Sequence, residues 1–396
     1  MSRSDPEAVE LNPISYDFHD DPYPIYRRLR DEAPVYWNEE HQFFALSRFA
    51  DVHGAFRDWE TFSNSRGIAL ETMPMGGSET GMMLEMDPPD HTRLRKLVSK
   101  VFTPRRINEL ETRIREIVRH YVEPFRRAGG GDLIGEVCGP FPMDVISVML
   151  GVESAADRAH LRHLADDLVA REDGRIEIPP KAVTAWMDIQ EYFRADVARR
   201  RSDPDDGLIG ALIETDVDGE RLTDREVIGF AFLFVVAGHE TTTKLLGNLA
   251  LELWRHPDQR RELGDDPSLI PNALEEILRY NTSSQYMARY TRRRSEYHGV
   301  AIPPDSVVLL LIGAAQRDDR EFEDPDRFDI HRDIRRSLAF GSGPHFCLGA
   351  SLARLEGRVA VEELLPALGD YDIDLDGCER IHAGNVMGYH RIPVST

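Results

Sequence analysis

Cys347 is the residue whose type and surroundings most clearly predict chemistry in this chain. It lies in the run from Phe340 to Gly349, FGSGPHFCLG, whose glycines let the backbone turn tightly and approach a ligand closely. From Leu348 onward, apolar residues recur at helical spacing, so the sulfur is predicted to lie at a helix N-terminus, where the helix dipole favours an anion. A lone cysteine is more often a buried structural residue, but this glycine-dense frame makes Cys347 a candidate thiolate.

The cysteine content disfavours most other cysteine chemistry. Only Cys138, Cys347 and Cys378 are present, and none forms a C-x-x-C pair, which argues against a zinc or iron-sulfur cage and against a disulfide framework. An odd number of cysteines suits a reducing cytosol, so we expect a cytoplasmic protein. The glycine spacing also misses the G-x-G-x-x-G dinucleotide fingerprint. A single thiolate suits a metal whose other ligands belong to a cofactor, which points to haem.

From Phe340 to Gly349 the chain resembles the signature loop of the cytochrome P450 family, F-G-x-G-x-H-x-C-x-G, at every specified position. The family holds haem by a cysteine thiolate. The resemblance implies that Cys347 is the proximal iron ligand of haem b, framed by Phe340 and Gly349. It also implies the fold of the family, mainly α with a smaller β part, in which a long central helix lies over the haem and the cysteine loop beneath it.

Two upstream elements extend the resemblance. Glu276 and Arg279 match the E-x-x-R pair of the family, and the run from Pro325 to Phe328 matches its P-x-R-F element. The arginine of that element, here Arg327, is expected to complete a buried charge cluster behind the haem. At i,i+3 spacing Glu276 and Arg279 share one helix face, so an ordinary surface ion pair is the alternative interpretation.

The segment from Thr223 to His256 predicts one helix of about 30 residues. It opens with the capping box T-D-R-E and contains no proline. Within its apolar sequence the run GHETTT, 238–243, is anomalous, because glycine and three β-branched threonines weaken a helix and a buried acid is costly. An i,i+4 ion pair between Glu240 and Lys244 is one explanation. The other is that positions 237 and 238 leave room for a flat cofactor while Glu240 and Thr241 supply protons.

Residues 237–241 also resemble the oxygen-activation motif of the family, A-G-x-[DE]-T. The resemblance implies that Ala237 contacts the haem and that Glu240 and Thr241 are catalytic. The implied enzyme is a monooxygenase that inserts one atom of O2 into an apolar small molecule, by hydroxylation or epoxidation. A haem-thiolate protein without oxygen chemistry, such as a sensor, is the alternative, and the presence of both Glu240 and Thr241 favours the enzyme.

A cationic block stands out in this acidic chain. Six Lys or Arg and no acid occur from His91 to Arg106, while the whole chain has a net charge of -22. Such a run is usually a solvated helix face, but here it favours a bound anion. By resemblance, His91 and Arg95, together with Arg289 and His345, bind the two haem propionates.

Family position also predicts the lining of a substrate pocket. These residues are Met82, Met83, Leu233, Val236, Val386 and Met387. The first two belong to a Met-rich loop, 72–87, which could adapt to many apolar shapes or be a flexible surface loop with buried ends. Fatty acids, terpenoids, sterols, aromatic acids and polyketides all remain candidate substrates.

The organisation of the chain agrees with one domain over residues 1–396. The length alone suggests two or three domains, but no linker, repeat or low-complexity tract divides it. Helical patterns dominate at 90–278 and after position 348, and strand-like pieces occur at 35–45, at 299–312 and near the C-terminus. The resemblance extends from Asp21 to the end.

The partners follow from what the sequence contains. Its apolar stretches are much shorter than the ~20 residues that span a bilayer, so we expect no membrane anchor and a likeness to the soluble bacterial branch of the family. Acidity argues against nucleic acid, and we expect a monomer. Because no flavin or iron-sulfur domain is appended, electrons must come from a separate ferredoxin with its NAD(P)H reductase. Four cations are proposed to dock it on the cysteine side: Arg105, Arg106, Arg335 and Arg336.

Overall fold

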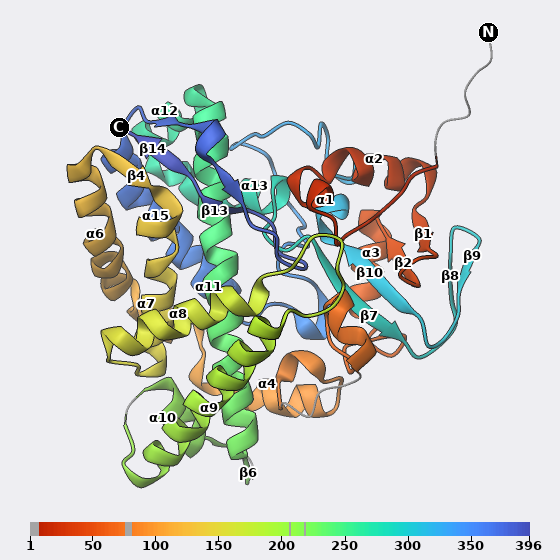
Figure 1. Ribbon diagram of the computed structural model, residues 1–396, viewed down its shortest axis with the longest axis horizontal. Coiled ribbons are helices and arrows are strands. Elements are labelled where there is room, and N and C mark those ends of the chain that lie inside the picture. The colour runs from red at the N-terminus through yellow and green to blue at the C-terminus, as the bar shows by residue number, and fades with distance from the viewer. Residues whose placement is uncertain (1–7, 76–80, 206, 218) are drawn as a thin grey trace.

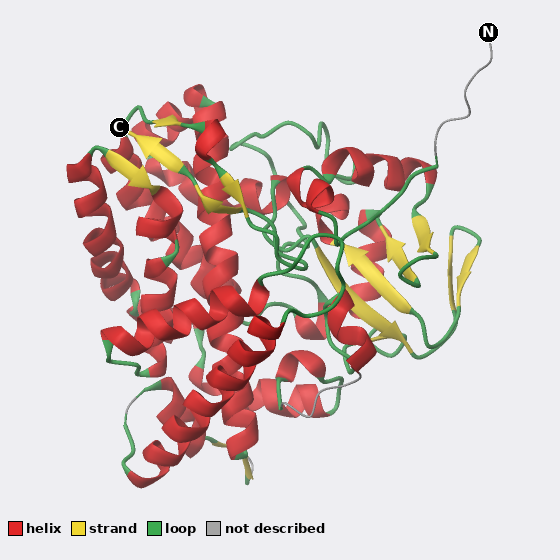
Figure 2. Ribbon diagram, in the orientation of Figure 1, coloured by secondary structure: helices red, strands yellow, loops and turns green. Residues whose placement is uncertain are grey.

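The computed structural model describes residues 8–75, 81–205, 207–217 and 219–396, and it has a large helical part beside a smaller sheet part (Figures 1 and 2). The predicted fold class, mainly α with a smaller β part, is confirmed. Gly76 and Gly77 of the Met-rich loop lie outside the described residues.

The α-helices of the described chain are short at the N-terminus and longer in the helical part. They are α1 Tyr16–Asp20, α2 Tyr23–Glu32, α3 Phe49–Arg57, α4 Asp90–Val101, α5 Pro104–Glu109, α6 Glu111–Ala128, α7 Pro140–Leu150, α8 Ala155–Val169, α9 Pro180–Ser202, α10 Leu208–Glu214, α11 Asp224–Arg255, α12 Pro257–Asp265, α13 Ile270–Tyr280, α14 Ile312–Ala315 and α15 Ala350–Leu368. A π-helical turn spans Ile134–Cys138.

Helix α11 runs through the middle of the helical part (Figure 1). Its first turn is held by the predicted capping box, in which the hydroxyl of Thr223 accepts from the N–H of Glu226 and the carboxylate of Glu226 accepts from the N–H of Thr223. Helices α7, α8, α9 and α15 pack against it. Because neighbours cover it on several sides, apolar residues occur around much of its circumference.

The main sheet has the strand order β1-β2-β10-β7-β3. Its strands are β1 Val35–Asn38, β2 Phe43–Leu46, β10 Val307–Leu311, β7 Tyr286–Thr291 and β3 Phe62–Ser63. Strand β10 is parallel to β2, whereas the other neighbours are antiparallel.

Both faces of this sheet are buried. Leu309 and Leu311 pack with Ala288 on one face, while Val308 and Leu310 pack on the other. This alternation follows the two-residue period of a strand. The sheet therefore forms a second centre of packing beside the helical core, which includes residues from α4 to α15.

Shorter strands form separate pairs and a small three-stranded sheet. They are β4 Gly130–Asp132, β5 Asp216–Val217, β6 Glu220–Arg221, β8 Ser295–Tyr297, β9 Val300–Ile302, β11 Asp372–Ile373, β12 Glu379–Arg380, β13 Tyr389–Arg391 and β14 Pro393–Ser395. Taken singly, no described helix combines the length and the apolar composition needed to cross a membrane. The segments 134–150 and 155–169 meet that test only as a pair, with a bend of 118° between them.

Candidate active site

The loop that carries Cys347 is folded as its glycines require. Gly341 and Gly343 adopt φ of 70° and 73°, a left-handed conformation that glycine tolerates best. A Cβ at Gly343 would also lie 2.8 Å from the carbonyl oxygen of Phe56. The N–H of Cys347 donates to the carbonyl oxygen of Phe340 at 2.9 Å and closes the loop three residues before α15. The side chain of Cys347 is left exposed.

Opposing influences act on the Cys347 sulfur. Burial raises the pKa of its thiol, whereas the N–H groups of Gly349 and Ala350 and the cations Arg95 and Arg354 lower it. The sulfur is thus enclosed by protein on most sides and open on one. A thiol held in this way becomes a stable thiolate when a metal ion binds on the open side.

Four predicted anion-binding residues converge beside this loop. His91 and Arg95 come from α4, Arg289 from β7 and His345 from the loop itself. The rings of His91 and His345 have centroids 4.1 Å apart. Among the described residues, neither ring nitrogen of His91 has a hydrogen-bond partner, nor has Nε2 of His345.

The pKa values of these residues show that the cluster is rich in positive charge. Burial, and then Arg95, lower the pKa of His91 to about 4. Burial, followed by His91, Arg289 and Arg95, lowers the pKa of His345 to about 2. Burial also lowers the pKa of Arg289 to about 10, with Asp87 acting in the opposite direction. Burial and neighbouring cations make the positive form of each of these groups less stable. A ligand with two negative groups would offset this effect by forming ion pairs with them.

The structure also explains which arginine of the 289–294 stretch joins the cluster. Arg289 is buried, whereas the side chains of Arg292, Arg293 and Arg294 are 43%, 64% and 70% exposed and pair with Asp87, Glu60 and Glu296. Arg289 lies within β7, whereas the three more exposed arginines follow the end of that strand at Thr291.

Helix α11 presents a partly open stripe in an otherwise buried stretch. Leu233, Val236, Ala237 and Thr241 retain accessible surface, and their spacing places them on one helix face. The hydroxyl of Thr241 donates to the carbonyl oxygen of Ala237 at 2.8 Å. Gly238 is also partly accessible, and it has a contact that the sequence did not predict. A Cβ there would lie 2.8 Å from Cδ1 of Ile146, so the glycine allows close packing against α7.

The Glu240 carboxylate takes part in the ion pair that the sequence offered as one explanation. It lies 3.1 Å from Nζ of Lys244, and both side chains are almost fully buried. Its other oxygen lies 3.5 Å from Nδ1 of His239. Burial raises the pKa of Glu240, but Lys244 and a hydrogen bond with Asp166 hold it below its ordinary value. The acid is therefore favoured in its charged form.

The residues predicted to line the substrate pocket do not all lie in one core. Met83 is buried in the helical core, and Met82 and Val236 pack against it. Met387 lies instead in the core on one face of the sheet. Val386 is brought toward α11, since it forms a β-bridge with Ser284.

The neighbouring residue, Ser283, completes that connection. Its hydroxyl donates to the carbonyl oxygen of Thr241 at 2.9 Å. Its own carbonyl oxygen accepts from the N–H of Met387 at 2.8 Å. The stretch 386–387 is therefore tied to α11 beside Thr241.

The pair Glu276 and Arg279 is fully buried and bidentate, with N–O distances of 2.7 and 2.8 Å. The surface-pair interpretation is thus wrong. The expectation for Arg327 is also wrong, because 66% of its side chain is exposed and it pairs with Asp329. Arg332 completes the cluster instead, with Nε 3.3 Å from Glu276.

Two carboxyl groups that meet α11 escaped the sequence analysis. Asp166 on α8 lies close enough to Glu240 for the two carboxyls to share a hydrogen bond, and burial together with Glu240 raises the pKa of Asp166 to about 7. Burial raises the pKa of Glu356 on α15 to about 8, and its side chain bonds to Thr242. No motif marks either residue, because each meets α11 from a distant part of the chain.

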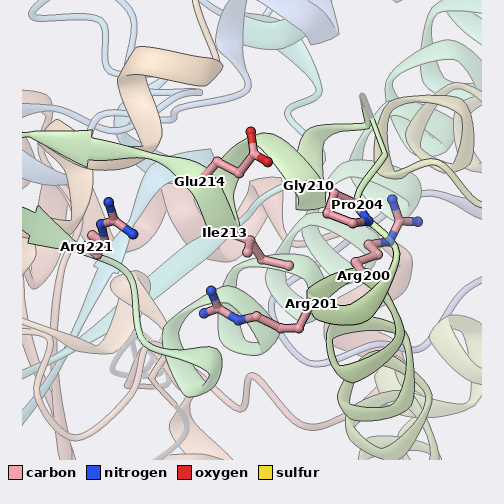
Figure 3. Close-up of a pocket in the computed structure, with 7 residues that line it drawn as sticks. All are labelled: Arg200, Arg201, Pro204, Gly210, Ile213, Glu214 and Arg221. Atoms are coloured by element: carbon pink, nitrogen blue, oxygen red, sulfur yellow. The ribbon is translucent and has the colours of Figure 1, made fainter.

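A separate surface hollow of about 310 Å³ lies at the ends of α9 and α10 (Figure 3). It is lined by Arg200, Arg201, Pro204, Gly210, Ile213, Glu214 and Arg221. Arg200 is buried and bound to Asp196 and Asp205, so its charge is already neutralised within the protein. None of the predicted site residues lines this hollow.

Comparison with known proteins identifies the relatives of this chain. The cytochrome P450 family model matches residues 268–368. A protein of Mycobacterium tuberculosis named as cytochrome P450 123 is 46% identical over 394 residues, which cover 99% of this chain and 98% of the relative. The vitamin D(3) 25-hydroxylase of Pseudonocardia autotrophica is 41% identical over 393 residues, covering 96% of this chain and 95% of the relative.

Solved structures give the same result. Cytochrome P450 CYP109Q5 from Chondromyces apiculatus is similar with a TM-score of 0.88 and 35% identity, over 98% of each chain. CYP109E1 from Bacillus megaterium, in complex with testosterone, is similar with a TM-score of 0.89 and 28% identity, over 96% of this chain and 98% of that one.

Proposed function

This chain belongs to the cytochrome P450 family of haem b monooxygenases, and from that premise we propose that it oxidises a large apolar ring compound of the steroid type. The reaction is insertion of one oxygen atom from O2, as a hydroxylation or an epoxidation. One relative is named a vitamin D(3) hydroxylase and one similar structure holds testosterone, which supports this substrate class. The open face of α11 offers apolar side chains, Leu233 and Val236, for such a molecule.

The observation that carries the proposal is the proximity of the sulfur to the cation cluster. Arg95 acts on the Cys347 sulfur and also on His91 and His345. A cofactor that offers a metal to the thiolate and two carboxylates to the unpartnered histidine nitrogens fits this arrangement. Haem b has those groups, and when bound it supplies the iron that activates O2.

The roles of the protein groups follow from their positions. Cys347 would hold the iron, while His91, Arg95, Arg289 and His345 would bind the propionates; Phe340 and Gly349 would shape the loop. Ala237 would pack on the cofactor, since its small side chain lies in the open stripe of α11.

Proton delivery is assigned to neighbouring residues of α11. The hydroxyl of Thr241 lies in the partly open stripe, where it can donate and accept hydrogen bonds. Glu240 would bring protons to this position. Its ion pair with Lys244 keeps the carboxylate charged between proton transfers.

Electrons would come from a separate ferredoxin with its NAD(P)H reductase. The cations proposed to dock it are partly neutralised by neighbours: Arg105 pairs with Glu109, Arg335 with Asp333 and Arg336 with Glu321. For Arg106 the structure gives a bond to the carbonyl oxygen of Val101. Arg106 is therefore the best of the four for long-range attraction.

Isotope labelling tests the proposed reaction. The haem-loaded protein is incubated with a ferredoxin, its reductase and NADPH, and with vitamin D3 or testosterone under ¹⁸O2. We expect a change of haem spin state on binding and a product that carries one ¹⁸O atom. No spin-state change and no labelled product with either compound would refute the substrate class.

A further inference from the structure

Asp166 links the buried acid of α11 to the outside of the protein. Its carboxyl is close enough to that of Glu240 to share a hydrogen bond, and the polar atoms of Asp166, His239 and Glu240 lie within 4.8 Å of one another. Of the two acid side chains, 44% of Asp166 is exposed but only 4% of Glu240. The two carboxyls thus connect solvent with the interior.

The hydrogen bond between these carboxyls requires a proton. An ionised carboxylate can only accept hydrogen bonds, so one of the two must be protonated. Lys244 lies 3.1 Å from Glu240 and stabilises the charged form of that acid. Burial and the charge of Glu240 raise the pKa of Asp166 to about 7. At neutral pH a large share of the shared proton therefore resides on Asp166.

His239 gives independent support for a proton in this cluster. It is buried, burial lowers its pKa, and its Nε2 lies 3.1 Å from the carbonyl oxygen of Gly139. Nε2 must carry the hydrogen in that bond, so Nδ1 is an unprotonated acceptor. Nδ1 lies 3.5 Å from Glu240 and 4.0 Å from Asp166, without a hydrogen-bond partner in the described chain. A buried lone pair that faces two carboxyls is tolerated best when one of them is protonated.

The charged groups around Asp166 come from two helices. Glu240, His239 and Lys244 face it from α11, and Arg162 acts on it from α8. Two charges on the other helices packed against α8 are bound elsewhere. Lys181 of α9 pairs with Asp167, and Asp144 of α7 pairs with Arg158. The ammonium of Lys244 within the cluster also opposes a metal ion there.

Resting on the proposed monooxygenase function, we propose that Asp166 is the solvent-facing proton donor to Glu240. In each transfer the O–H bond of Asp166 breaks and an O–H bond forms on Glu240. The Asp166 carboxylate then takes a proton from water through its exposed side. One proton moves from solvent to the residue beside Thr241, and no electrons are exchanged.

A titration of the carboxyl groups tests the shared proton without turnover. In the haem-loaded protein, ¹³C NMR of labelled aspartate should show one carboxyl that titrates close to neutral pH. That signal should be absent in Asp166→Asn and should move toward the ordinary aspartate range in Glu240→Gln, because the repelling charge is gone. An Asp166 carboxyl that is ionised throughout the neutral range would overturn the proposal.

Kinetics test the relay itself. With substrate and redox partners, Asp166→Asn should slow O2 consumption by about tenfold or more and raise the solvent deuterium isotope effect. Wild-type rates should fall as pH rises through about 7, the pKa of the donor, and this fall should be lost in Asp166→Asn. Asp166→Glu should restore much of the rate.

Asp167→Asn is the matched control. Asp167 follows on the same helix but binds Lys181 and His163 instead of the cluster, so its substitution should leave rate and pH profile unchanged. Wild-type O2 consumption and pH profile in Asp166→Asn would overturn the relay alone. A wild-type enzyme that forms no labelled product would instead overturn the proposed function, whereas the carboxyl titration would still report on the shared proton.

Discussion

At the scale of single residues, protonation is set by close neighbours. Burial raises the pKa of the Cys347 thiol, and the cations and N–H groups around the sulfur oppose this effect. Burial also acts on Glu240, but Lys244 keeps the pKa of that acid low. The side chain of Thr241 carries no charge, and its hydroxyl donates to the carbonyl oxygen of Ala237. A substitution of Thr241 should therefore test proton transfer with little effect on folding.

Thr241→Ala removes the hydroxyl from the open stripe of α11. Product formed per NAD(P)H should fall by roughly tenfold, less than the ~10² loss of a removed general acid, because water can replace the hydroxyl in part. Hydrogen peroxide should rise, while haem content and substrate affinity stay unchanged. Thr241→Ser keeps the hydroxyl and should couple nearly as well as wild type. Full coupling in the alanine variant would show that another group delivers the proton.

At the scale of elements, packing between elements decides which residues of a sequence motif are buried. The i,i+3 spacing shows that Glu276 and Arg279 share a face of α13, but not that other elements cover this face. The structure covers it with the segment 325–332, whose carbonyl oxygens at Pro325 and Arg327 accept from Arg279. Arg327 thus contributes its backbone while its side chain points outward. The motif gave the correct segment and the wrong side chain, since Arg332 is five residues farther on.

Arg279→Met should destabilise the protein strongly, because it leaves the Glu276 carboxylate buried and only partly paired. Breaking such a pair costs about 3 to 5 kcal/mol, and some of this cost is offset here by Arg332. Arg327→Met removes an exposed ion pair and should cost less than about 1 kcal/mol. Urea unfolding of both variants, with haem release as a second signal, measures the difference. Equal losses would contradict the assignment of Arg332 to the cluster.

At the scale of the molecule, the sequence predicted local elements better than long-range contacts. Capping and apolar pattern predicted α11, and the glycine frame predicted the Cys347 loop. Strand β7 was missed, although it completes the sheet and carries Arg289. The contact between Asp166 and Glu240 was missed because it joins α8 to α11 across a long stretch of sequence. The contact of Gly238 with Ile146 was missed because only the packing of α7 shows what lies beside this glycine.

The charge of the whole chain makes docking of an electron donor depend on a local patch. With a net charge of -22, an acidic ferredoxin would be repelled except near exposed cations on the cysteine side. Electron transfer should slow as salt rises, since the Debye length is about 10 Å at 0.1 M. Arg106→Ala should lower the rate at low salt by up to about fivefold, equivalent to ~1 kcal/mol for an exposed charge. Arg335→Ala should lower it less, because Asp333 already pairs with Arg335.

Stopped-flow reduction at several salt concentrations measures these rates. A rate that does not change with salt would exclude this face as the docking site. An equal effect of the two substitutions would show that the surface ion pairs do not weaken the patch.

The central claim is that Cys347 holds the haem iron as a thiolate, and the spectrum of the reduced protein with CO tests it most directly. Wild type and Cys378→Ser should both show the strongly red-shifted Soret band that marks sulfur opposite CO. Cys347→His should lose this band while haem remains bound at the cation cluster. A red-shifted band that persists in Cys347→His would contradict the account, because another residue would then be the ligand.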